Sequence, residues 1–153
     1  MKYIPNKQRR VPEVVPKFWR PKLTPATKLD AKLAHHDLVH RLETGAATVA
    51  DLWDWMETGF TYSQMMRLLH QDGERFTDEA IKAVDDQLNT YPAVCQRLRE
   101  RRRVGLSGPE LQIARQAAQV FDGLIDLDRN GIAVAAVQWS ERQMSRIRGA
   151  LAC

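Results

Sequence analysis

The sequence predicts an all-α protein, a compact bundle of six or seven helices that follows an extended, proline-rich basic arm. From residue 25 onward, apolar side chains recur every three or four positions, which is the period of an amphipathic helix. Threonine or serine precedes most of these segments, and glycine or proline follows them, as expected for helix caps and stops. The stretch 132–137 alone could pass for a strand, but no second stretch could pair with it. We therefore divide the 153 residues into an arm over 1–24 and one helical domain over 25–153.

Seven helical segments are separated by short turns. In order they cover residues 25–44, 49–58, 61–72, 77–91, 93–103, 109–127 and 132–151. Thr24, Thr48, Thr77 and Ser107 stand where N-caps are needed. Two separations depend on single residues, because Gly59 is expected to end the second helix and Pro92 to end or kink the fourth. Thr61 is expected to cap the third.

The helix over 111–127 has the widest apolar arc in the chain. Its apolar positions fill about half of the helical wheel, whereas a surface helix usually needs a narrower stripe. So wide an arc implies contact with two or more helices. These helices could belong to one chain or meet across the two-fold axis of a homodimer, so the oligomeric state stays open.

The formal net charge of +4 is unevenly placed along the chain. Residues 1–23 carry a net charge of +6, residues 97–103 carry +4, and the remainder carries −6. The sequence thus describes an acidic body with two basic features. Such segregated charge bears on partners and association rather than on the fold.

Composition argues against a secreted or membrane-spanning protein. Cys95 and Cys153 form no metal-binding or disulfide motif, so a reducing, cytoplasmic location is expected. No apolar run approaches the roughly 18 residues of a membrane span. The first residues pair charges with prolines where a signal peptide needs an apolar stretch.

The segment 97–103 is the strongest candidate for partner binding. It holds five arginines in seven residues: Arg97, Arg99, Arg101, Arg102 and Arg103. A helix C-terminus attracts cations in any case, but it would need fewer of them. Guanidinium groups bind carboxylate and phosphate bidentately, so the cluster could equally clamp an acidic surface.

Two further groups of residues combine cations with tryptophan. In the arm, Lys17 and Arg20 flank Trp19, a mixture that can stack on bases or strap onto the body of the protein. In the last helix, Trp139 falls on the polar side together with Arg142 and Arg146, as in an interface hot spot. Ordinary packing against a neighbouring helix is the alternative for Trp139.

The histidines of the first helix are the only candidate metal ligands. His36 and His40 are spaced i, i+4, with His35 beside them, and side chains at that spacing project to one side of a helix. The same face carries Leu29 and Leu33, so a buried or half-buried packing role is equally compatible with the pattern. Two ligands alone do not complete a zinc site.

The segment from Gly59 to Leu69 resembles the turn and helix of sigma-factor-like helix-turn-helix domains. The resemblance covers eleven residues and implies a DNA-binding regulator that reads sequence with the helix after Thr77. That helix begins after a longer turn than the family has. It also carries Asp78, Glu79, Asp85 and Asp86 against one lysine, and four carboxylates would repel phosphates.

Over most of the chain, the layout resembles a loose group of uncharacterised helical proteins from prophages and other mobile elements of proteobacteria. The likeness lies in the proline-rich basic arm, the His35-His36 pair and the segment Val104-Gly-Leu-Ser-Gly-Pro-Glu-Leu111. The resemblance implies an accessory role and no particular activity. Small non-enzymatic proteins in that context regulate transcription or block host defence complexes.

These observations favour a non-enzymatic accessory protein that binds a host protein or nucleoprotein complex, and inhibition of a defence system, as by an anti-CRISPR protein, would suit it. No phosphate loop, nucleophile elbow or nucleophile with a suitable base appears at a recognisable spacing, and no cofactor is implied. A DNA-binding transcriptional regulator and a metal-dependent enzyme at His36 and His40 are the alternatives. The sequence itself does not identify the partner.

Overall fold

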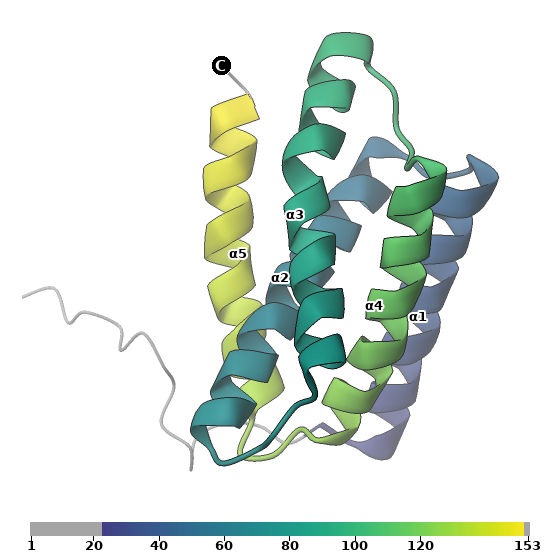
Figure 1. Cartoon of the computed structure of the whole chain (residues 1–153). Helices are drawn as coiled ribbons and strands as arrows, with labels where there is room; N and C mark the ends of the chain where they lie inside the picture. Colours follow the sequence, from purple (N-terminus) through teal and green to yellow (C-terminus); the bar gives the residue numbers. More distant parts are fainter. Residues whose placement is uncertain (1–22, 152–153) are drawn as a thin grey trace, which may run out of the picture.

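The computed structural model describes residues 23–151 and folds them into five α-helices (Figure 1). The helices are α1 (Pro25–Thr44), α2 (Val49–Gln71), α3 (Asp78–Arg101), α4 (Gly108–Asp126) and α5 (Ile132–Leu151). The all-α prediction is confirmed for this part of the chain, including the stretch 132–137, whereas the predicted number of six or seven helices is wrong. The arm over 1–22 lies outside the described residues.

Gly59 does not end a helix, because it lies within α2 where α3 approaches most closely. A Cβ atom at Gly59 would lie 1.7 Å from Tyr91 Oη and 2.7 Å from Gln87 Nε2, so no larger residue fits. The two segments that the sequence predicted on either side of Gly59 are therefore one helix. Thr61, the expected cap, lies inside α2 and donates its hydroxyl to the Glu57 carbonyl at 3.0 Å.

Pro92 lies inside α3 and does not end it. A proline removes one backbone N–H and so one helical hydrogen bond, which usually interrupts a helix. Here Pro92 is exposed, while Tyr91 and Val94 on the adjoining face are buried. Burial of that face on both sides of the proline offsets the lost hydrogen bond, so the two predicted segments form one helix of 24 residues.

The helix N-termini follow the predicted capping chemistry. Thr24, Thr48, Thr77 and Ser107 each accept a hydrogen bond from the backbone N–H three residues later. In α2 and α4 the acidic side chain of that third residue also accepts from the cap N–H, which completes a capping box. These local signals explain why the starts of α1 to α4 could be predicted.

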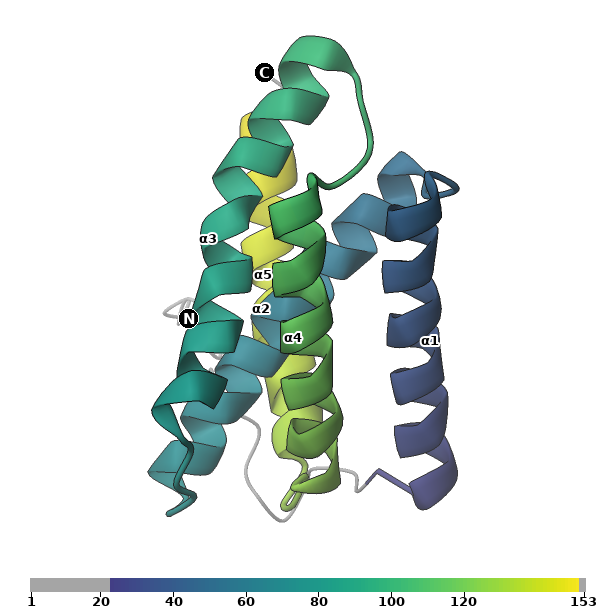
Figure 2. The ribbon, with the colours of Figure 1, turned by 45° about the vertical axis from the view of Figure 1, so that its right-hand side comes forward.

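Successive helices run in alternating directions along the bundle (Figures 1 and 2). The C-terminal ends of α1, α3 and α5 therefore lie at one end of the molecule. The central helix is α2, which contacts each of the other four, and its contact with α5 is the most extensive. None of the helices in residues 23–151 combines the length and apolar character that a membrane span requires.

Two clusters of buried side chains form the core. In one, Tyr62 of α2 stacks on Phe121 of α4 with ring centroids 4.4 Å apart. In the other, the fully buried Trp55 of α2 meets the Tyr91 ring of α3 edge-on at 5.1 Å. The helix α4 contributes to both clusters, as its wide apolar arc predicted.

Candidate partner-binding surface

Four arginines at the end of α3 are exposed and have no internal partner among the described residues. They are Arg99, Arg101, Arg102 and Arg103, which we call the arginine end. Exposed guanidinium groups that form no internal ion pair keep their full capacity to bind an anion. This segment therefore keeps most of the cationic character that the sequence predicted for it.

Arg102 holds a backbone conformation that is uncommon for a residue with a side chain. It is the C-cap of α3 with φ +49° and ψ +33°, in the left-handed region, and its N–H donates to the Leu98 carbonyl at 2.9 Å. Glycine is the usual residue at such a position, because a Cβ atom there costs roughly 1 kcal/mol. Arg102 therefore keeps a positive charge in the arginine end, although glycine would strain the backbone less at this position.

Arg97 differs from the other arginines of the cluster, because it is used inside the protein. Its guanidinium donates to both carboxylate oxygens of Glu110, at 2.8 and 3.0 Å, and to the Gly105 carbonyl at 3.1 Å. Burial alone would raise the pKa of Glu110, but the hydrogen bonds from Arg97 and the Ser107 N–H outweigh it and lower that pKa. Arg97 thus anchors the loop between α3 and α4 to the start of α4.

A hollow of about 280 Å³ lies beside the arginine end. Arg101 and Arg103 line it from one side, and Leu42 and Glu43 of α1 line it from the other. The Glu43 carboxylate is already paired with Arg115 of α4. Arg101 and Arg103 on the wall of the hollow therefore form no ion pair with a described carboxylate.

The C-terminal end of α5 lies at the same end of the bundle as the arginine end (Figure 1); Arg142 and Arg146 belong to the C-terminal half of α5, and Trp139 belongs to its N-terminal half. Arg142 and Arg146 are exposed and unpaired among the described residues. Trp139 is half-buried, and its ring meets Phe60 edge-on at 6.2 Å, so part of the tryptophan serves packing. Lys17, Trp19 and Arg20 lie outside the described residues.

The histidines do not assemble a metal centre. His36 Nε2 lies 2.7 Å from Asp122 Oδ2, and His40 is exposed without a partner among the described residues. Nowhere in residues 23–149 do three His, Cys, Asp or Glu side chains come together as a potential metal site. His36 has the hydrogen bond to a neighbour that the packing alternative expected, but both His36 and His40 are exposed, and Leu29 and Leu33 on the same face are 55% and 60% exposed.

The segment that resembled a helix-turn-helix has a different geometry. Residues 59–69 belong to the long helix α2 and not to a turn followed by a new helix. Asp78, Glu79 and Asp85 are exposed on α3, which would have to enter the major groove. These carboxylates would meet the phosphate backbone and repel it.

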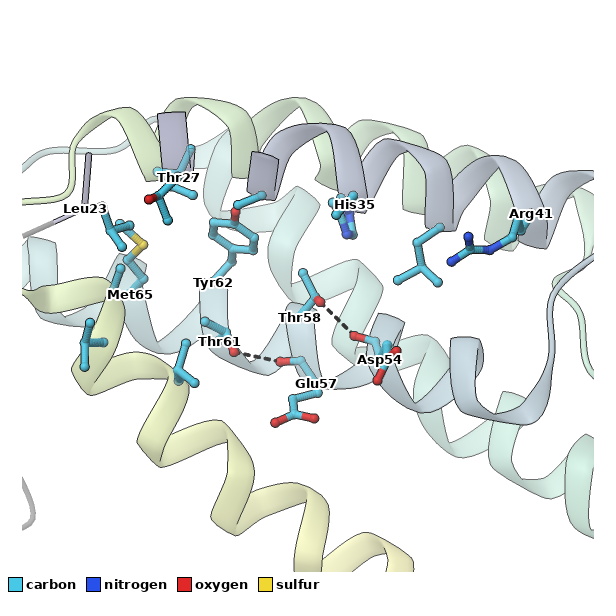
Figure 3. A pocket seen from close by; sticks show the side chains of 17 residues that line it. Leu23, Thr27, His35, Arg41, Asp54, Glu57, Thr58, Thr61, Tyr62 and Met65 are labelled. Carbon is cyan, nitrogen blue, oxygen red and sulfur yellow. Dashed lines mark hydrogen bonds between the residues drawn. The ribbon is translucent and has the colours of Figure 1, made fainter. Parts of the chain in front are cut away.

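A second, larger concavity lies between α1, α2 and α5 (Figure 3). We call it the long groove; it measures about 500 Å³ and is lined mainly by apolar side chains. Buried His35 is among its lining residues, and its pKa is lowered to about 4, first by burial and then by neighbouring His36, while Asp122 opposes the shift. Its residues are far apart in the chain, so the sequence carried no signal for the groove.

Comparison with known proteins adds no family or relative, so a proposed function has to be argued from the geometry of the surfaces described above. No protein-family model matches the sequence, and searches among curated proteins and among solved structures give no significant match.

Proposed function

We propose that the protein is a non-enzymatic binding protein that occupies an acidic surface of a host protein or nucleoprotein complex with its arginine end. The observation that carries this proposal is the presence of four exposed, internally unpaired arginines within residues 99–103. A guanidinium group donates two parallel hydrogen bonds to a carboxylate or phosphate, so a cluster of them recognises dense negative charge.

Two structural features support a recognition role over simple solvation of a helix end. The arginine end flanks a hollow into which an acidic side chain could reach Arg101 and Arg103. Arg142 and Arg146 add exposed cations on the C-terminal half of α5, the half that runs toward the same end of the bundle (Figure 1). Clustered charge of one sign steers association with an oppositely charged partner and speeds it.

The layout of the chain resembles that of proteins from prophages and mobile elements, and we take such an element as the setting in which the protein acts. In that setting the partner is a host defence complex, and binding would inhibit the complex by covering the surface that it needs. The protein then requires no catalytic group and no cofactor of its own.

The test replaces Arg101, Arg102 and Arg103 with alanine and measures capture of the partner from host lysate. The matched control replaces three other exposed cations, Arg67, Arg75 and Lys82, with alanine, which removes the same net charge elsewhere. We expect the first variant to lose capture and the control to keep it, with unchanged helical circular dichroism in both. Unchanged capture by the first variant, or equal loss in both, would contradict the proposal.

A titration with duplex DNA distinguishes the competing regulator function. Binding through phosphates weakens steeply as salt rises, so it is most evident at low salt. We expect no DNA binding at low salt. Strong, salt-sensitive binding that disappears in the variant lacking Arg101, Arg102 and Arg103 would instead assign the arginine end to nucleic acid.

A further inference from the structure

The long groove has an apolar wall that no described residue covers. Val137 on its α5 side is 42% exposed, and Leu38 and Met65 line its opposite sides. A volume of about 500 Å³ lies within the range of sites that bind ligands or peptide side chains. The polar residues Asp54 and Glu57 of α2 lie opposite the part of α1 around His35, and Asp54 is the nearer of the two to Arg41 (Figure 3).

Buried polar atoms in this groove lack hydrogen-bond partners. Both ring nitrogens of His35 and Nε of Arg41 are buried without a partner among the described residues, and His35 is only 5% exposed. Buried polar atoms are nearly always hydrogen-bonded in folded proteins, because an unsatisfied one costs about 1–3 kcal/mol. The groove thus has the character of a site whose occupant supplies N–H and C=O groups as well as apolar side chains.

We propose that this occupant is the chain's own segment 14–22, which lies extended in the long groove and antiparallel to α1. Phe18 and Trp19 cover the apolar wall, and the Trp19 indole N–H donates to His35. Lys17 lies beside the carboxylates of Asp54 and Glu57. This inference concerns another face of the molecule than the arginine end and does not depend on the proposed function.

The length of the segment matches the length of the groove. Leu23 lines the groove at the end near Thr27, so the preceding residues begin at its entrance (Figure 3). An extended chain advances about 3.3 Å per residue, so Trp19 reaches roughly 13 Å beyond Leu23. At 1.5 Å per residue, His35 lies roughly 12 Å from Thr27 along α1. By the same measure Lys17 reaches roughly 20 Å, which is the level of Arg41, and its side chain can reach back to Asp54, which lies between the levels of His35 and Arg41 (Figure 3).

The charge and composition of the segment also match the groove. Residues 1–22 carry a net charge of +6, whereas the wall of the groove opposite His35 holds the carboxylates of Asp54 and Glu57. Burial raises the pKa of Glu57, as do Glu141 and Asp54 against the opposing effect of Arg148, so an added cation would be favourable there. Pro16 and Pro21 favour an extended backbone and reduce the entropy lost on docking. Attachment at Leu23 keeps the effective concentration of the segment high.

The test joins neighbouring lysines and carboxylates in the full-length protein with a zero-length carbodiimide cross-linker, followed by peptide mapping. We expect Lys17 to be joined to Asp54 or Glu57 within the monomer. Lys22, which would lie at the groove entrance, should not be joined to either carboxylate. No Lys17 cross-link to these residues, or one found only in covalent dimers, would overturn the proposal, since the dimer result would place a second copy in the groove.

A pair of variants separates docking from chance proximity. Ala34 is exposed and lines the groove, so Ala34→Phe fills the space that the segment would occupy. Ala93→Phe adds the same ring at an exposed helical position of α3 outside the groove. We expect the cross-link yield to fall roughly tenfold in Ala34→Phe and to stay unchanged in Ala93→Phe, with cooperative thermal unfolding retained in both. An equal yield in the two variants would overturn the proposal.

Discussion

The hydroxyl of Tyr91 lies directly against the backbone of Gly59, where α2 and α3 touch. Tyr91 Oη accepts a hydrogen bond from Gln87 Nε2 at 2.9 Å and donates to the Trp55 carbonyl at 3.4 Å. The Tyr91 ring is buried, and it meets the rings of both Trp55 and Phe60 edge-on. This one side chain therefore sets the spacing between the two helices, and it leaves no room for a Cβ atom at Gly59.

Replacing Gly59 with alanine should destabilise the protein by about 2 kcal/mol. In an open helix the change would stabilise by about 1 kcal/mol, because alanine favours the helix more than glycine does. Here the added Cβ would clash with Tyr91 Oη, and overpacking of this kind costs about 3 kcal/mol. Chemical denaturation of Gly59→Ala, Tyr91→Phe and the double variant measures the coupling. Tyr91→Phe should recover part of the loss in the double variant, and strictly additive losses would contradict this account.

The arginines of residues 97–103 should separate into one structural and four surface residues. Arg97→Ala should lower the free energy of unfolding by about 2 kcal/mol, because it removes charge-assisted hydrogen bonds to Glu110 and the Gly105 carbonyl. Arg99→Ala is the matched control and should change stability by less than about 0.5 kcal/mol. Urea unfolding of both variants checks the difference, and similar losses would mean that Arg97 has no special role.

Local chemistry explains which parts of the fold could be predicted from the sequence. The starts of α1 to α4 depend on a threonine or serine and the three residues that follow it, so each signal is complete within four positions. The roles of Gly59 and Pro92 depend on what packs against them. Gly59 was expected to be a stop because glycine often is one, but the neighbour that requires glycine is Tyr91, 32 positions later.

The candidate site likewise has parts that the sequence predicts and parts that depend on contacts between distant residues. The concentration of charge over residues 97–103 is a property of the sequence, so four of its five arginines could be identified as available. The partner of Arg97 is Glu110, which only the turn between α3 and α4 brings close. In α1 the exposed face carries Leu29 and Leu33, so their apolar pattern made packing a possible role for His36 and His40, whereas the buried histidine is His35.

Replacing Arg102 with glycine should stabilise the protein and weaken its binding at once. Glycine relieves the strain of the left-handed backbone, but it also gives the unfolded chain more freedom. The net increase in the free energy of unfolding is roughly 0.5–1 kcal/mol. The same change removes one cation from the arginine end, so capture of the partner should fall. Arg103→Gly removes a neighbouring cation at a residue without positive φ and should give no such gain in stability. Thermal melting and capture are measured together, and a stabilised variant with undiminished capture would exclude Arg102 from the binding surface.

Stability should fall as the pH is lowered from about 6.5 to about 4, because His35 is buried in its neutral form. Burial is the main reason that its pKa is lowered to about 4, while the ordinary histidine pKa of 6.5 applies to the unfolded chain. Below pH 6.5 the unfolded chain therefore binds a proton that the folded protein does not, which favours unfolding. The full difference corresponds to about 3 kcal/mol, lost progressively until the folded histidine also titrates near pH 4.

The His35→Leu variant tests whether this pH dependence belongs to His35. The variant cannot bind the extra proton on unfolding. Between pH 6.5 and 4, the decline in its free energy of unfolding should therefore be about 3 kcal/mol smaller than the decline in the unmodified protein. His40→Leu is the control, since His40 is exposed and its removal should leave the slope unchanged. Urea denaturation at several pH values measures both slopes. If the His35→Leu protein kept the full decline, the acid sensitivity would have to come from the carboxylates, because paired carboxylates such as Glu110 have lowered pKa values and also lose their stabilising effect as the pH falls.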